Sequence, residues 1–243
     1  MARARSVLRG EARIASELRQ LLRDPVNSGE GLPRGNGRLV LVLPGLFAND
    51  FYLEPMHRWL KRMGYRPLRS TLLLNAGCPQ RLCEDIESHL RERRQSFRRS
   101  DPIAIIGHSR GGILGWTIAA RMQDEVSQLV LLGSPAHWAA SLIGRAAPSG
   151  AGRIAAQRAS DRARQALDPD CNMPACGCPF PRDLQRPLHH ATQITSIYTR
   201  EDPIVPSGAC PVPGAHNVEV GGSHSGLAYN IEAYRVIAEA LAG

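Results

Sequence analysis

Short runs of apolar residues alternate with amphipathic and charged segments along most of the chain. Residues 39–43 are apolar at every position, which is typical of a strand buried on both faces of a sheet. Strands are predicted there and in five further segments, residues 67–74, 103–106, 126–132, 194–199 and 217–220. Helices are predicted between and after them, over residues 52–64, 80–97, 110–122 and 226–241. This alternation predicts an α/β fold, with a mostly parallel central sheet and helices on both faces.

The first 26 residues have a different pattern, with apolar side chains at helical spacing and arginines between them. They predict an amphipathic basic helix that precedes a single domain over residues 38–243. Such a helix can rest on an anionic membrane surface. We favour the alternative that its apolar stripe packs on the body of the same protein.

Residues 136–190 interrupt the alternation of strands and helices. The segment is rich in glycine, proline and arginine, and one helix is predicted within it, over residues 154–167. It is too long for an ordinary connection between two elements. We therefore expect a functional insertion that forms a cap or lid on the domain.

Composition narrows the classes of function. The 243 residues carry a net charge of +8, and all but one of the 30 basic residues are arginine, Lys61 being the exception. A basic balance suggests nucleic-acid binding, but only 5% of the residues are aromatic and they do not interleave with a basic stripe. We expect a solvated, arginine-rich surface and no nucleic-acid partner. Weak contact with an anionic membrane surface stays open.

The composition of the chain also gives expectations about its compartment and its cofactors. No apolar run approaches the roughly 18 residues of a membrane span, and residues 1–24 lack the apolar core of a secretory signal. This favours the cytoplasm, although a trimmed N-terminus would allow secretion. The six cysteines lack the repeated spacing of a zinc site, so we expect neither a metal nor a cofactor. Cys78 and Cys83 are close enough in sequence for a local bridge, and the pattern predicts no particular oligomeric state.

A candidate nucleophile lies where the third predicted strand meets the next helix. Gly107-His108-Ser109-Arg110-Gly111 fits the pattern G-x-S-x-G, in which the glycines permit a sharp turn that leaves the serine hydroxyl exposed above the sheet. The hydroxyl then lies at a helix N-terminus, where the helix dipole favours developing negative charge. The alternative is a glycine-rich turn with a helix-capping serine.

A serine hydroxyl needs a base to take its proton and an acid to orient that base. In this architecture the acid and then the histidine follow the serine, in loops at the carboxyl ends of later strands. Asp202 follows the strand over residues 194–199, and Glu201 is the alternative acid. His224 follows the last strand and a pair of glycines, and is the expected base.

An oxyanion intermediate needs two preorganised N–H donors. We assign one to the backbone of Arg110, the residue after the nucleophile. We assign the other to Leu46, in the Pro-Gly-Leu-Phe loop after the first strand. We expect substrate contacts from Phe47, His108 and Trp138, of which the two apolar side chains would line an acyl pocket.

Four motifs in order, PGLF after a strand, GHSRGG, YTREDPIVP and GGSHSGL, resemble the α/β-hydrolase fold and its bacterial lipase- and esterase-like members. The resemblance covers about residues 38–242 and leaves the N-terminal helix as an addition. It implies that Ser109 is the nucleophile, Asp202 the acid and His224 the base. Many lipases carry His-Gly where this chain has Pro44-Gly45, a difference that leaves the following N–H donor in place.

The resemblance also gives the later cysteines a role. A disulfide between Cys210 and one of the insertion cysteines, Cys171, Cys176 or Cys178, would tie the lid to the acid loop. Unlinked thiols are the alternative.

The sequence therefore predicts a serine carboxylic-ester hydrolase, an esterase or lipase that forms an acyl-enzyme from esters with apolar acyl chains. An acyltransferase or thioesterase would use the same acyl-enzyme with a different acceptor or leaving group. A binding protein without catalytic activity is a third class, which would not need a serine, an acid and a histidine in this order.

Overall fold

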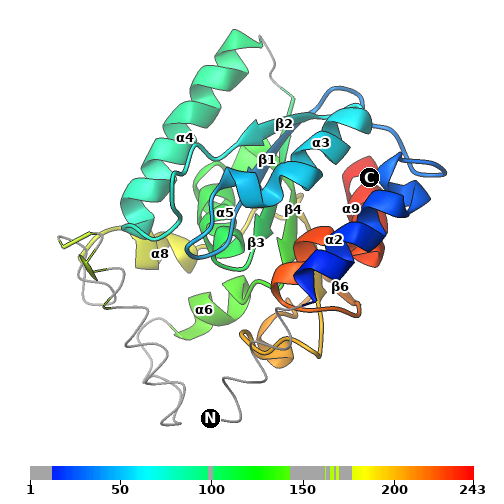
Figure 1. Ribbon diagram of the computed structural model, residues 1–243. Coiled ribbons are helices and arrows are strands. Elements are labelled where there is room, and N and C mark those ends of the chain that lie inside the picture. Colours follow the sequence, from blue (N-terminus) through cyan, green and yellow to red (C-terminus); the bar gives the residue numbers. More distant parts are fainter. Residues whose placement is uncertain (1–12, 98–100, 143–161, 163–164, 167, 170–176) are drawn as a thin grey trace.

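The computed structural model describes residues 13–97, 101–142, 162, 165–166, 168–169 and 177–243 (Figure 1). Within these residues the chain forms one sheet of six parallel strands in the order β2-β1-β3-β4-β5-β6. The strands are β1 (Leu39–Leu43), β2 (Arg66–Arg69), β3 (Ile103–His108), β4 (Val126–Leu132), β5 (Gln193–Tyr198) and β6 (His216–Glu219). The predicted α/β architecture is confirmed.

The strands differ in burial according to their place in the sheet. Every residue of β1 and β3 is buried, because helices cover both faces of the central strands. The edge strands β2 and β6 expose half or more of their residues, in line with their polar sequences. The apolar runs therefore mark the middle of the sheet, where the candidate nucleophile follows β3.

Two layers of helices enclose the sheet, as Figure 1 shows. One face is covered by α2 (Ile14–Arg23), α3 (Glu54–Arg62) and α9 (Ile231–Ala242). The other face is covered by α4 (Pro79–Ser96), α5 (Arg110–Arg121), α6 (Ala136–Leu142) and α8 (Phe180–Leu184). Short 3-10 turns are η1 (Pro25–Asn27), η2 (Asp50–Leu53), η3 (Gln123–Glu125), η4 (Ser207–Ala209) and η5 (Ser225–Tyr229). None of the helices in the described part of the chain is long and apolar enough to cross a membrane.

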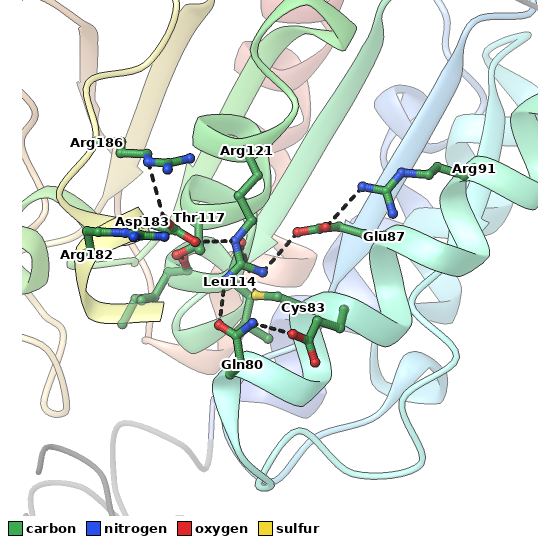
Figure 2. A network of polar contacts seen from close by, with 12 residues as sticks. Gln80, Cys83, Glu87, Arg91, Leu114, Thr117, Arg121, Arg182, Asp183 and Arg186 are labelled. Atoms are coloured by element: carbon green, nitrogen blue, oxygen red, sulfur yellow. Dashed lines mark hydrogen bonds and ion pairs between the residues drawn. The ribbon is translucent and has the colours of Figure 1, made fainter. Parts of the chain in front are cut away.

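A buried ion-pair network joins three helices on the second face (Figure 2). The Arg121 guanidinium of α5 donates to Glu87 of α4 at 3.1 Å and to Asp183 of α8 at 2.9 Å. It also donates to the Gln80 side-chain oxygen at 2.6 Å. The three charged side chains are only 6–11% exposed, so each needs the others to offset its lost hydration. The network fixes α8, which precedes β5, against α4 and α5.

The second strand is shorter than the sequence predicts. It ends at Arg69, whereas the apolar pattern continues to residue 74. The Asp50 carboxylate accepts hydrogen bonds from the Ser70 and Thr71 N–H groups at 2.9 and 3.0 Å, and Thr71 has a positive φ of 63°. These bonds turn the chain out of the sheet. The predicted last helix is likewise divided, since Asn230 ends η5 and caps α9.

The remaining expectations meet the structure only in part. Most of the predicted helix over residues 154–167 lies outside the described residues, as do residues 1–12 of the N-terminal helix. The lid therefore stays a prediction. Cys78, Cys83 and Cys210 are free thiols. The Cys78–Cys83 bridge and a bridge from Cys210 to the insertion are thus not formed.

Candidate active site

Ser109 lies between the end of β3 and the first residue of α5, in the strand–turn–helix context that the motif requires. Its backbone has φ 51° and ψ −120°, in the positive-φ region that non-glycine residues rarely adopt. Strain of this kind persists only where the surrounding structure imposes it, and it concentrates at functional sites. The turn puts the serine side chain at the N-terminus of α5.

The glycines of the motif are needed for close packing. A Cβ at Gly107 would overlap the backbone of α5 at Gly111 and Gly112. A Cβ at Gly111 would overlap the carbonyl oxygens of Leu43 and Pro44. Without side chains at these two positions, the start of α5 lies directly against β3 and against the loop after β1. The candidate nucleophile and the candidate oxyanion loop are neighbours for this reason.

Asp202 and His224 are in direct contact, although 22 residues separate them. His224 Nδ1 lies 2.6 Å from Asp202 Oδ2, and the two side chains are only 5% and 2% exposed. The other carboxylate oxygen accepts the Ile204 and Val205 N–H groups at 2.8 and 2.7 Å, which fixes the orientation of the carboxylate. The alternative acid, Glu201, is 57% exposed and pairs with Arg13 instead.

The turn that carries Ser109 and the loop that carries His224 meet through His108. Its Nε2–H donates to the His224 carbonyl oxygen at 3.0 Å, and the two rings lie 5.0 Å apart. Burial lowers the pKa of His108 to about 3, so the ring is neutral. Within the described residues, no hydrogen bond links the Ser109 hydroxyl to His224. The structure therefore joins Asp202 to His224, and it links the His224 loop to the turn that carries Ser109 through His108.

His108 was expected to contact the substrate, and its environment favours a different role. The side chain is 3% exposed and lies between the rings of Tyr52, at 5.6 Å, and His224. Its only hydrogen bond within the described chain goes to the His224 backbone, while Nδ1 is buried without a partner. This geometry suits a residue that supports the histidine loop.

The loop after β1 is held in place by Asn75, which the sequence analysis did not single out. Its side-chain amide donates to the Pro44 carbonyl at 2.7 Å, and its backbone carbonyl accepts a hydrogen bond from the Phe47 N–H at 3.1 Å. The Arg110 guanidinium donates to the same carbonyl at 3.0 Å. In the described structure the Leu46 N–H has no such partner, so this group rather than that of Phe47 is available to an oxyanion. No local motif identifies Asn75, because its partners are distant in sequence.

The loops around Ser109 carry exposed apolar side chains. Phe47 is 44% exposed, Leu73 92% and Ile204 47%. Trp138 packs with Val205 and Cys210, beside the loop that carries Asp202. Much of the segment expected to complete an acyl pocket lies outside the described residues, so the substrate contacts of Phe47 and Trp138 stay predictions. Two cavities of about 320 and 150 Å³ open beside the acid and histidine loops, and Ser109 lines neither.

No group of three or more histidine, cysteine, aspartate or glutamate residues in the described part of the chain could hold a metal ion.

Comparisons with known proteins support the fold. No family model and no curated protein matches the sequence. An extracellular alpha/beta-hydrolase from a Paenibacillus species is 12% identical with a TM-score of 0.54, covering 84% of this chain and 97% of that one. A Bacillus licheniformis lipase is 13% identical with a TM-score of 0.53, covering 87% and 94%. A Paleococcus ferrophilus monoacylglycerol lipase is 12% identical with a TM-score of 0.53, covering 87% and 96%. At such identities the likeness shows a shared fold.

Proposed function

Since the chain has the α/β-hydrolase fold, we propose that it is a serine carboxylic-ester hydrolase in which Ser109 is the nucleophile. The observation that carries the proposal is the pairing of a strained Ser109 at a helix N-terminus with a buried Asp202–His224 hydrogen bond. A fold of this kind hosts many activities, so the function is inferred from the site and not from the fold.

In this mechanism Ser109 Oγ attacks the ester carbonyl carbon, and the proton of the serine hydroxyl passes to His224 Nε2. Asp202 accepts the Nδ1–H hydrogen bond, which holds the imidazole in the tautomer whose Nε2 is free to accept that proton. The imidazolium then protonates the leaving alcohol. Water, deprotonated by the same histidine, attacks the acyl-enzyme and releases the acid.

The negative oxygen of each tetrahedral intermediate is stabilised by the N–H groups of Leu46 and Arg110. Asn75 fixes the first of these donors by holding the loop at Pro44 and Phe47. Removing one oxyanion donor typically costs about 10²–10³ in kcat.

The substrate is an ester with an apolar acyl chain. Phe47, Leu73 and Ile204 are exposed apolar side chains on loops that surround the candidate site. Covering such residues with an acyl chain is favourable, by about 0.8 kcal/mol for each methylene that becomes buried.

A panel of aryl esters from acetate to laurate tests this function. Wild-type protein should hydrolyse them, with kcat/KM rising roughly tenfold or more from acetate to medium chains. Ser109→Ala should abolish turnover of all of them without unfolding the chain. Hydrolysis by the alanine variant would contradict the role of Ser109, and an optimum at acetate would contradict the apolar acyl site.

A further inference from the structure

The N-terminal helix α2 makes contacts with the candidate catalytic loops that the motif analysis did not anticipate. Glu17 is a carboxylate that is only 8% exposed, although it lies on a helix rich in charged residues. A buried carboxylate is costly unless hydrogen bonds replace its lost hydration. The burial of the Glu17 carboxylate must therefore be explained by the groups that it binds.

Both oxygens of Glu17 bind the residue that precedes His224. Oε1 accepts the Ser223 N–H at 2.9 Å, and Oε2 accepts the Ser223 hydroxyl at 2.8 Å. The Ser223 hydroxyl oxygen in turn accepts the Gly226 N–H at 3.1 Å. The carboxylate thus fixes the backbone on both sides of His224.

The glycines around His224 leave room for this carboxylate. A Cβ at Gly222 would lie 2.9 Å from Glu17 Oε1, and a Cβ at Gly226 would overlap Oε2. Gly222 also has a φ of 114°, a backbone conformation that residues with a side chain rarely adopt. The motif GGSHSG is therefore shaped to receive Glu17 as well as to present His224.

Helix α2 also reaches the loop of the candidate acid. Arg13, at its N-terminus, pairs with Glu201, the neighbour of Asp202. The helix is anchored on the body by Leu21, which is fully buried and belongs to the core of that face of the sheet. In Figure 1 the blue helix α2 lies beside the orange segment that precedes α9.

We propose that Glu17 is a positioning residue that holds the His224 loop, so that helix α2 is an integral part of the active site. The inference rests on the proposed function for its kinetic readout. Asp202 orients the imidazole from its ring side, and Glu17 fixes the backbone from which the ring projects.

Kinetics of three variants test the proposal. Glu17→Ala should lower kcat for a short aryl ester by about tenfold to a hundredfold, because small displacements of a base are costly, while KM changes less than about twofold. Glu17→Gln keeps one acceptor oxygen and should recover part of that loss. Arg19→Ala, a substitution at an exposed position of the same helix, is the matched control and should behave as wild type.

A second readout does not depend on ester turnover. The proton shared by His224 and Asp202 should give a strongly deshielded NMR signal in the wild type. Loosening the loop in Glu17→Ala should broaden this signal or remove it. If wild-type protein hydrolyses no ester, the proposed function fails, and this signal alone decides the positioning role.

Two outcomes would overturn the proposal. One is a folded Glu17→Ala protein with wild-type kcat and an unchanged proton signal. Should Glu17→Ala fail to fold, Ser223→Ala replaces it, since that change removes only the hydrogen bonds of the Ser223 hydroxyl. A wild-type kcat and an unchanged signal in Ser223→Ala would then overturn the proposal.

Discussion

At the scale of single residues, adjacent side chains have different tasks because their surroundings differ. Asp202 is buried and bound to His224, while Glu201, next to it, is exposed and bound to Arg13. Sequence order alone left both as candidate acids. Direct contact with the imidazole is a tertiary property, and it favours Asp202.

Asp202→Asn should lower kcat by about three to four orders of magnitude, because the amide would favour the wrong imidazole tautomer. Glu201→Gln should leave kcat within a few-fold of wild type. Steady-state kinetics on one aryl ester would compare them. A larger loss in Glu201→Gln than in Asp202→Asn would exchange the two roles.

His108 predicts a pH dependence of stability. Its pKa in the folded chain is about 3 because the ring is fully desolvated, whereas an unfolded histidine titrates at about 6.5. Protonation therefore favours the unfolded chain. The contribution of His108 to the stability of the fold is complete above pH 6.5 and is lost progressively as the pH decreases toward 3. The slope is at most about 1.4 kcal/mol per pH unit for this one proton.

Urea unfolding of wild type and His108→Gln between pH 7 and 4 measures that contribution. The variant should lose less stability on acidification than the wild type. His57, which is also buried with a lowered pKa, contributes to both proteins alike. Equal slopes in wild type and His108→Gln would show that His108 titrates normally.

At the scale of elements, helices are fixed by a few long-range polar contacts in addition to apolar packing. The buried Arg121 network binds α8 to α4 and α5 (Figure 2). The Asp50 carboxylate turns the chain out of β2. The hydrogen bonds of Asp50 explain why β2 ends before its apolar pattern does. A local pattern of residue types cannot predict this end, because Asp50 lies about 20 residues away in the sequence.

Arg121→Met should destabilise the fold by up to about 3–5 kcal/mol, because Glu87 and Asp183 would lose their buried cationic partner. The arginines that remain bound to them, Arg91, Arg182 and Arg186, are 46–71% exposed and offset the burial of the carboxylates only weakly. Arg91→Met removes the other arginine bound to Glu87, but Arg91 is 54% exposed and its loss should cost less than about 1 kcal/mol. Urea unfolding measures both. If the two variants were equally stable, the buried network would contribute nothing beyond a surface ion pair.

At the scale of the whole molecule, the sequence predicts the parts of the fold that depend on local pattern. The fully buried runs of β1 and β3 and the sharp turn at Ser109 follow directly from apolar continuity and glycine placement. Glu17 and Asn75 do not, because each acts on a loop far away in the chain. The choice between disulfides and unlinked thiols, which the sequence left open, is decided by the fold for a related reason, since sequence spacing does not fix which thiols meet.

Covalent labelling of the nucleophile tests the central claim most directly. Wild-type protein treated with a fluorophosphonate should gain the mass of one label, and peptide mapping should find it on Ser109. Ser109→Ala should gain none, and His224→Ala should react far more slowly, because its serine has no base. A label on another residue, or undiminished labelling of Ser109→Ala, would contradict the assignment of Ser109 as the nucleophile.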